Sequence, residues 1–183
     1  MNLTGQIIVS MPSLEDVRFF KTVIYMCAHS SEGSMGIIIN KKIDYDLYPD
    51  LLEQLGIDKP LNNKKLFIRY GGPVESGRGF VLHSDDMVRK ETLNIKKGVS
   101  LTNTTEFFED LSIGKGPENS ILALGYAGWG PGQLEEEILQ NSWINLDVEN
   151  SFIFDSEVSK KWTQAYKIMG VNPINLSIKS GRA

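Results

Sequence analysis

Short runs of β-branched and aromatic residues recur along this 183-residue chain, and the order of these runs constrains its fold more than any other feature. Residues 22–28 form one such run, residues 30–36 are turn-forming, and residues 37–40 form a second run. Two strands joined by a short turn make an antiparallel hairpin. The runs at 67–70 and 79–83 also follow one another without a helix between them. A doubly wound sheet needs a helix between consecutive strands, so this order predicts an α+β fold.

The remaining elements follow from hydrophobic spacing and from capping residues. A strand is expected where apolar residues alternate or run together, and a helix where they recur at spacings of three and four. Further strands are expected at 6–9, 99–101, 121–124, 143–146 and 174–178, and helices at 44–56, 104–111, 131–140 and 155–170, with a short helical turn after Ser13.

The whole chain, residues 1–183, suits one domain, because no linker-like stretch divides it and its length can supply a full core. The single cysteine, Cys27, excludes an internal disulfide framework and fits a reducing compartment. The first 20 residues lack the basic and long apolar regions of a signal peptide, and no run approaches a membrane span. We therefore expect a cytoplasmic protein with no membrane association.

The charge of the chain argues against a nucleic-acid partner. Its formal net charge is −4, and its basic residues come as scattered pairs rather than one cluster. Binding to phosphates needs clustered Lys and Arg side chains. Direct DNA binding is therefore the weaker alternative, and we expect an unknown protein or small-molecule partner.

Motifs that carry familiar chemistry are absent from the sequence. It contains no dinucleotide-binding glycine fingerprint, no phosphate-binding Walker loop and no nucleophile elbow. The two histidines do not show zinc-ligand spacing, so no metal or cofactor is expected. Cys27 and His29 are two apart on a predicted strand and should share a face, which leaves a reactive thiol–imidazole pair as an alternative.

The stretch LGYAGWGPGQLEEEI, residues 124–138, places several glycines around Tyr126 and Trp129. Pro131 suits the first position of the following helix, and the glutamates 135–137 satisfy its positive end, which disfavours a phosphate there. The glycines predict a sharply turning loop that presents the two aromatic side chains. Such a loop either plugs the core or forms a binding platform, and the sequence leaves both possibilities open.

Five motifs occur in order along the chain: MPSLED (11–16), the hairpin IYMCAHSSEGSMGIIIN (24–40), GGPV (71–74), GFVLHS (79–84) and LGYAGWGPGQLEEEI with Asn141 and Trp143. Together they resemble the AlgH/YqgE family of bacterial proteins, over residues 3 to the C-terminus. The resemblance implies an α+β fold in which a bent mixed sheet forms a pseudo-barrel with four or five packed helices. Some members of that family are described as transcriptional regulators, and most are uncharacterised.

Three functional hypotheses follow. The first is a regulatory or binding protein that acts through a cleft or a protein interface, because loops on a rigid scaffold commonly carry function. The alternatives are a transcriptional regulator that binds DNA directly, and an enzyme that uses His83 or His29 with Cys27 or Ser84. The predicted cleft consists of Gly71, Gly72, Pro73, His83, Ser84, Gly125, Tyr126, Trp129 and Gly132.

Overall fold

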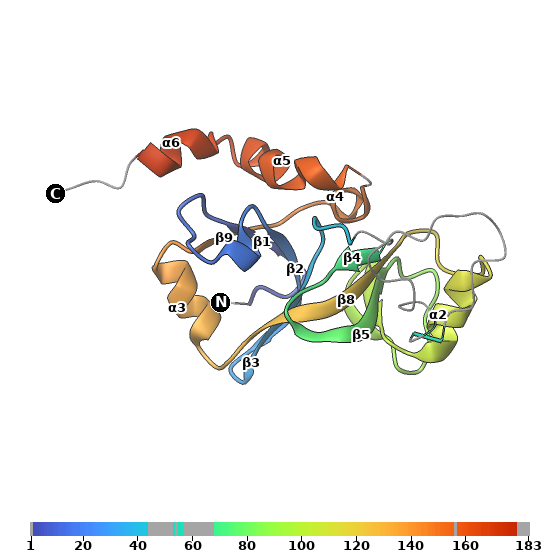
Figure 1. The fold of residues 1–183 in the computed structure, drawn as a ribbon. Helices are drawn as coiled ribbons and strands as arrows, with labels where there is room; N and C mark the ends of the chain where they lie inside the picture. Colours follow the sequence, from blue (N-terminus) through green and yellow to red (C-terminus); the bar gives the residue numbers. More distant parts are fainter. Residues whose placement is uncertain (1, 44–52, 54, 57–67, 156, 179–183) are drawn as a thin grey trace.

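The computed structural model describes residues 2–43, 53, 55–56, 68–155 and 157–178. In this part of the chain, nine strands form one sheet in the order β6-β7-β5-β8-β3-β2-β1-β9, and β4 pairs with β8 beside that path (Figure 1). All pairings are antiparallel except that of β4 with β8, so the sheet is mixed. The strands are β1 (Ile7–Ser10), β2 (Val23–Ser30), β3 (Gly33–Ile38), β4 (Ile68–Tyr70), β5 (Val74–His83), β6 (Leu93–Lys96), β7 (Val99–Thr102), β8 (Ser120–Trp129) and β9 (Trp143–Leu146).

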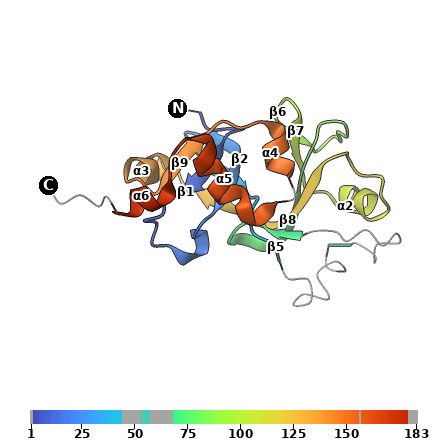
Figure 2. The same ribbon diagram turned by 90° about the horizontal axis from the view of Figure 1, so that it is seen from above.

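The helices lie in three places around this sheet. One group crosses the sheet over β1, β2 and β9, another helix lies beside β9, and a third packs at the far end near β5 and β8 (Figures 1 and 2). The crossing group is α4 (Asn150–Phe154), the 3-10 turn η3 (Val158–Lys160), α5 (Lys161–Ile168) and α6 (Pro173–Ile178). The helix beside β9 is α3 (Gln133–Leu139), the distant helix is α2 (Thr105–Ser112), and a 3-10 turn, η1 (Val17–Phe19), precedes β2.

Strand β1 and the first five residues of β2 are buried on both faces of the sheet, and almost all of these residues are apolar. Along β1, Ile7 and Val9 belong to the core under α5, whereas Ile8 belongs to the core under α3. Strand β2 divides its residues between the same two cores. A third core joins α2, through Phe107 and Phe108, to the sheet. Burial on both faces explains the unbroken hydrophobic runs from which these strands were predicted.

The α+β class and the mixed sheet are confirmed. The sheet is open, because its order ends at β6 on one side and at β9 on the other. The hairpin of β2 and β3 is confirmed, although β3 begins at Gly33, inside the predicted turn. The strand β6 was not predicted. The helix predicted at 44–56 lies almost wholly outside the described residues.

Several element boundaries differ from the prediction, and the largest difference is at the C-terminal end. The predicted strand at 174–178 is the helix α6, because Pro173 suits a first helical position and Asn172 Oδ1 accepts a hydrogen bond from Ile174 N at 3.0 Å. The predicted helix at 155–170 is shorter, since a 3-10 turn precedes α5. The helical turn expected after Ser13 is η1, and Asp16 rather than Ser13 caps it.

Two cations are buried between the sheet and the crossing helices. The side chain of Lys161, at the start of α5, is fully buried and donates a hydrogen bond to the carbonyl of Phe152. Arg69 of β4 is 6% exposed, and its Nε and Nη1 atoms have no hydrogen-bond partner among the described residues. Burial lowers the pKa of Lys161 to about 8, and the nearby positive charge of Arg69 lowers it in the same direction. Loss of water opposes the charged form of both side chains, and the nearby Asp155 carboxylate offsets this only in part at Lys161.

Among the described residues, no helix is long and apolar enough to cross a lipid bilayer.

Candidate functional site

A cavity of about 350 Å³ forms where η1, the start of β5, the end of β8 and α3 meet. Three larger cavities are present on the described surface, and one of them shares Val74, Gly128 and Trp129 with this cavity. The smaller cavity is also lined by three of the motifs that the sequence singles out. Its lining residues come from three separate chain segments, residues 14–19, 73–74 and 128–143. They are Leu14, Asp16, Arg18, Phe19, Pro73, Val74, Gly128, Trp129, Gln133, Glu137, Ser142 and Trp143. We call this cavity the tryptophan cleft.

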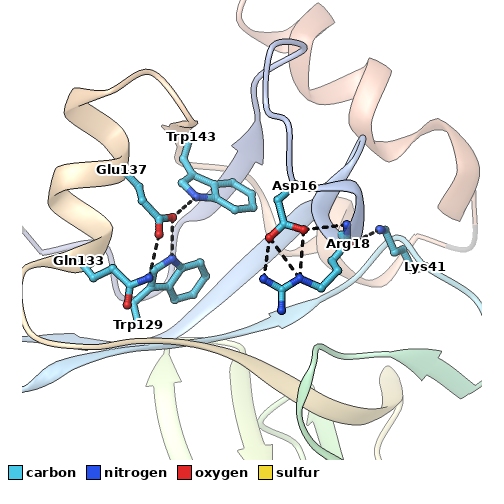
Figure 3. A network of polar contacts seen from close by, with 7 residues as sticks. All are labelled: Asp16, Arg18, Lys41, Trp129, Gln133, Glu137 and Trp143. Atoms are coloured by element: carbon cyan, nitrogen blue, oxygen red, sulfur yellow. Dashed lines mark hydrogen bonds and ion pairs between the residues drawn. The ribbon is translucent and has the colours of Figure 1, made fainter.

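The carboxylate of Glu137 stands at the centre of a polar network in this cleft (Figure 3). Its Oε2 atom accepts hydrogen bonds from Trp129 Nε1 at 3.0 Å and from Trp143 Nε1 at 2.7 Å. Its Oε1 atom accepts a third bond, from Gln133 Nε2 at 2.9 Å. All three donors are uncharged, so Glu137 is held in place without a basic partner among the described residues.

Local sequence explains how these groups come together. Trp129 ends β8 and Trp143 begins β9, and the short helix α3 between them carries Gln133 and Glu137. Gln133 and Glu137 are four apart and therefore share one face of that helix. Gln133 Oε1 also accepts a bond from Gly130 N at 3.0 Å, which ties the turn before the helix to the helix itself. The network thus fixes α3 against the end of β8.

Aromatic rings form the apolar walls of the cleft. The rings of Trp129 and Trp143 meet edge to face, with centroids 6.0 Å apart, and Phe19 meets Trp143 in the same way at 5.5 Å. Such edge-to-face pairs are the preferred aromatic geometry. Both tryptophans are largely buried, at 8% and 3% exposure, so the cleft has rigid walls.

A second carboxylate in the cleft, that of Asp16, is fully paired. Its two oxygens accept hydrogen bonds from the guanidinium of Arg18, at distances of 2.7 to 3.2 Å. This bond holds the pKa of Asp16 below its usual value. The nearby ammonium of Lys41 donates to the carbonyl of Arg18 at 2.5 Å (Figure 3). Asp16 and Glu137 therefore differ, because only the first has a counter-charge.

Close contact between two backbone segments sets the position of the GGPV motif. A Cβ atom on Gly71 would lie 2.2 Å from the carbonyl oxygen of Gly125, and one on Gly125 would lie 2.4 Å from that of Gly72. Only glycine allows the two segments to approach so closely. The crossing places Pro73 at the cleft, and it gives the glycines of both motifs a structural role.

The glycine-rich stretch was predicted to be a turning loop, and this prediction is wrong. Residues up to Trp129 continue β8, which pairs there with β3. Pro131 is not the first helical residue, because Gly132, with φ of 74°, occupies the N-cap position and the helix begins at Gln133. Tyr126 lines a different cavity and packs edge to face on Phe80.

The structure brings together only part of the predicted cleft. Pro73 and Trp129 line it, and Gly71, Gly72 and Gly125 support it from behind. His83 and Ser84 do not join them, because they lie at the opposite end of β5 from Val74. The β8 partners of His83 and Val74 are Ser120 and Tyr126, so the two ends are on the order of 20 Å apart.

His83 has a structural environment. Its ring is buried, and Nδ1 and Nε2 lie 2.8 Å from the carbonyl of Ser84 and 2.9 Å from Thr102 Oγ1. Burial lowers its pKa, so the imidazole is neutral at physiological pH. Ser84 bonds instead to Asp86 and to the backbone of Asn119.

Cys27 and His29 do not face the same way. A β-bulge between Met26 and Ala28 breaks the alternation of β2, which the sequence pattern could not reveal. Cys27 lies in the core under α5, and burial raises the pKa of its thiol to about 12. His29 instead accepts a bond from Leu3 N at 3.3 Å, and its Nε2 lies 3.1 Å from Glu135 Oε1. The pair therefore lacks the geometry of a thiolate nucleophile with its base.

Sequence analysis missed Asp16, Arg18, Phe19, Gln133 and Glu137 as site residues. The four-residue spacing of Gln133 and Glu137, directly after Trp129, was the available signal. From the sequence alone, Glu137 is considered only as one of three negative charges near the start of a helix. Among the described residues, no cluster of three or more histidine, cysteine, aspartate or glutamate side chains could hold a metal ion.

The open mixed sheet flanked by helices defines an α+β protein, and a family model described as AlgH-like matches residues 7–174. The chain belongs to this family. A UPF0301 protein of Bradyrhizobium diazoefficiens is 45% identical over 99% of this chain and 88% of its own length. A UPF0301 protein of Rhodopseudomonas palustris is 46% identical over 99% of this chain and 87% of its own length.

Solved structures agree with the fold. The solution structure of the AlgH protein from Pseudomonas aeruginosa superposes with a TM-score of 0.81 at 33% identity, and the match covers 100% of this chain and 97% of that one. A crystal structure of a Corynebacterium diphtheriae protein gives a TM-score of 0.72 at 20% identity, over 98% of this chain and 92% of that one. The second likeness concerns the fold alone. The UPF0301 names of the relatives state no activity.

Proposed function

We propose that this chain is a cytoplasmic binding protein that takes a small molecule, or a side chain of a protein partner, into the tryptophan cleft. The observation that carries the proposal is the convergence of three separate motifs on one cavity. Residues 14–19, 73–74 and 128–143 all contribute to its lining. Concave sites with apolar walls and a few fixed polar groups are where proteins commonly bind ligands.

The two other hypotheses have less support. An enzyme that uses Cys27 would need an accessible thiolate, whereas this thiol is buried and its pKa is raised. DNA binding would need a basic surface, whereas the chain has a net charge of −4. The cleft accounts for more of the motif residues than either alternative.

The tryptophans provide a direct test. The chain has three, and each gives one indole N–H signal in a nitrogen-labelled NMR spectrum. Trp129 and Trp143 lie in the cleft, whereas Trp162 donates to the carbonyl of Ser10 in another core and serves as an internal control.

The experiment is a screen of amines, carboxylates, sugars, nucleotides, short peptides and short DNA duplexes at about 0.1 M salt. A ligand of the cleft should move the Trp129 and Trp143 signals and leave that of Trp162 unchanged. If every compound that binds leaves both cleft signals in place, the proposal is wrong. A DNA duplex that shifts basic-residue signals instead would favour the regulator hypothesis.

A further inference from the structure

The charges in the tryptophan cleft do not balance, and this imbalance points to the chemistry of its ligand. Asp16 has Arg18 as its counter-charge, whereas the three donors to Glu137 are two indole groups and one amide. A carboxylate that is partly removed from water is most stable with a positive partner. Glu137 has none among the described residues, and it lines a cavity.

The walls suit an aliphatic chain on such a ligand. Both indole rings turn their N–H edges toward this carboxylate, so they add apolar contact beside it and the carboxylate itself supplies the attraction for the cation. Resting on the binding role proposed above, we propose that the cleft binds a primary ammonium group carried on an aliphatic chain. The ammonium donates to Glu137, and the chain lies against the aromatic walls.

The number of free acceptor positions distinguishes an ammonium from a guanidinium. A carboxylate offers about four lone-pair positions, two on each oxygen. In Glu137 the two indoles occupy both positions on Oε2, and Gln133 occupies one on Oε1. One position on Oε1 is left. An ammonium can bond to the carboxylate through this single position while water accepts its other two N–H groups, whereas a guanidinium binds best with two parallel bonds to both oxygens.

The test compares four probes that share a butyl chain: butylammonium, butylguanidinium, 1-butanol and butyrate. Each is titrated into the labelled protein, and the indole signals of Trp129 and Trp143 are followed, with Trp162 as the control. We expect butylammonium to bind at least about tenfold more tightly than 1-butanol, since a bond to a charged acceptor is lost in the alcohol. Butylguanidinium should be weaker than butylammonium, and butyrate should not bind.

Variants test the assigned carboxylate. Glu137→Gln removes the charge and should abolish binding of butylammonium. Glu136→Gln removes the same charge from an exposed neighbour on α3 that does not line the cleft, and it should bind normally. Loss of binding in both variants would mean that general acidity attracts the probe, which overturns the assignment. The probe series on the unmodified protein does not depend on either variant folding.

The outcomes separate this inference from the proposed function. Equal binding of butylammonium and 1-butanol, or tighter binding of butylguanidinium, overturns the ammonium inference and leaves the cleft as a binding site. If no butyl probe moves the cleft signals while another compound in the screen does, only the inference fails. A lysine-containing peptide, acetyl-Gly-Lys-Gly-amide, is the last comparison. Tighter binding than butylammonium identifies a protein side chain as the source of the ammonium, and weaker binding identifies a free amine.

Discussion

Replacement of Lys161 by methionine should stabilise the protein at neutral pH. The lysine side chain is fully buried, and its charged form is opposed by loss of water and by the nearby Arg69. Methionine has a similar length and needs no partner. The substitution therefore removes a buried charge while it keeps the packing of α5 against α4.

The magnitude follows from the pKa. Burial and Arg69 lower the pKa of Lys161 from 10.5 to about 8, and each unit corresponds to about 1.4 kcal/mol, so the folded state carries a penalty of about 3 kcal/mol below pH 8. The variant also loses the hydrogen bond to the Phe152 carbonyl, which the neutral amine can donate as well and which contributes about 1–2 kcal/mol. A net gain of about 1–2 kcal/mol is expected at pH 7.

The pH dependence gives a sharper test than the gain itself. Below pH 8 the lysine is charged in both the folded and unfolded states, and the full penalty is present. Between pH 8 and 10.5 the folded state loses its proton first, so the wild type gains about 3 kcal/mol relative to the variant. Above pH 10.5 the difference is constant, with the variant the less stable protein.

The assay is urea unfolding of both proteins at intervals from pH 7 to 11. Comparison of the two cancels the titration of groups that they share. Lys160→Met is the matched control, because that neighbouring lysine is exposed and forms an ion pair with the exposed Glu157. This variant should show little change in stability, and its difference from the wild type should not depend on pH between 8 and 10.5. A constant difference between wild type and Lys161→Met across pH 8–10.5 would refute the argument.

Three further predictions concern the core and the glycine crossing. Gly125→Ala and Gly132→Ala both introduce a side chain at positive φ, 69° and 74°, which costs about 1 kcal/mol of stability, but only the Gly125 Cβ would also lie 2.4 Å from the Gly72 carbonyl oxygen. Urea unfolding should therefore show a loss of stability at least twice as large for Gly125→Ala, and equal losses would contradict the close backbone contact. Cys27 should react with Ellman's reagent at pH 8 only at the rate of unfolding, because burial raises its thiol pKa to about 12; rapid reaction of the folded protein would show the burial to be wrong. His83 is neutral in the folded state because burial lowers its pKa, so as pH falls below about 6.5 the unfolded state takes up a proton first and the wild type should lose stability relative to His83→Gln. A difference in the free energy of unfolding that does not change with pH would mean that the folded state does not hold the ring neutral.

The parts of the fold that were predicted from sequence are those whose pattern is set locally. The hairpin of β2 and β3 follows from two β-branched runs separated by a turn, and α2 follows from its paired phenylalanines after a capping residue. The elements that were wrong depend on more distant contacts. Residues 124–129 contain glycines typical of a turn, but residues 127–129 pair with β3 and residues 124 and 126 pair with β5, so the strand continues through them. Residues 174–178 alternate as a strand would, yet Pro173 and the Asn172 cap start a helix.

The candidate site was predictable only in part for a similar reason. Trp129 and Pro73 could be chosen because their glycine-rich surroundings are unusual in the sequence. The role of Glu137 depends on hydrogen bonds from the indole groups of Trp129 and Trp143 to one of its oxygens. These contacts join separate strands, so no local sequence pattern predicts them. The separation of Cys27 from His29 depends on one inserted residue in β2, which the alternation of side chains cannot reveal.

Strand β8 joins two halves of the sheet, one made of β1, β2, β3 and β9 and the other of β4, β5, β6 and β7. It pairs with β3 near Trp129 and with β4 and β5 nearer its start. Neither half can open without breaking contacts of the other, so the two should exchange their amide hydrogens as one cooperative unit. A ligand held at the end of β8 would then slow exchange in β4 and β5 as well, although it touches only the first residues of β5. Occupancy of the cleft can thus be measured from amides that lie far from it.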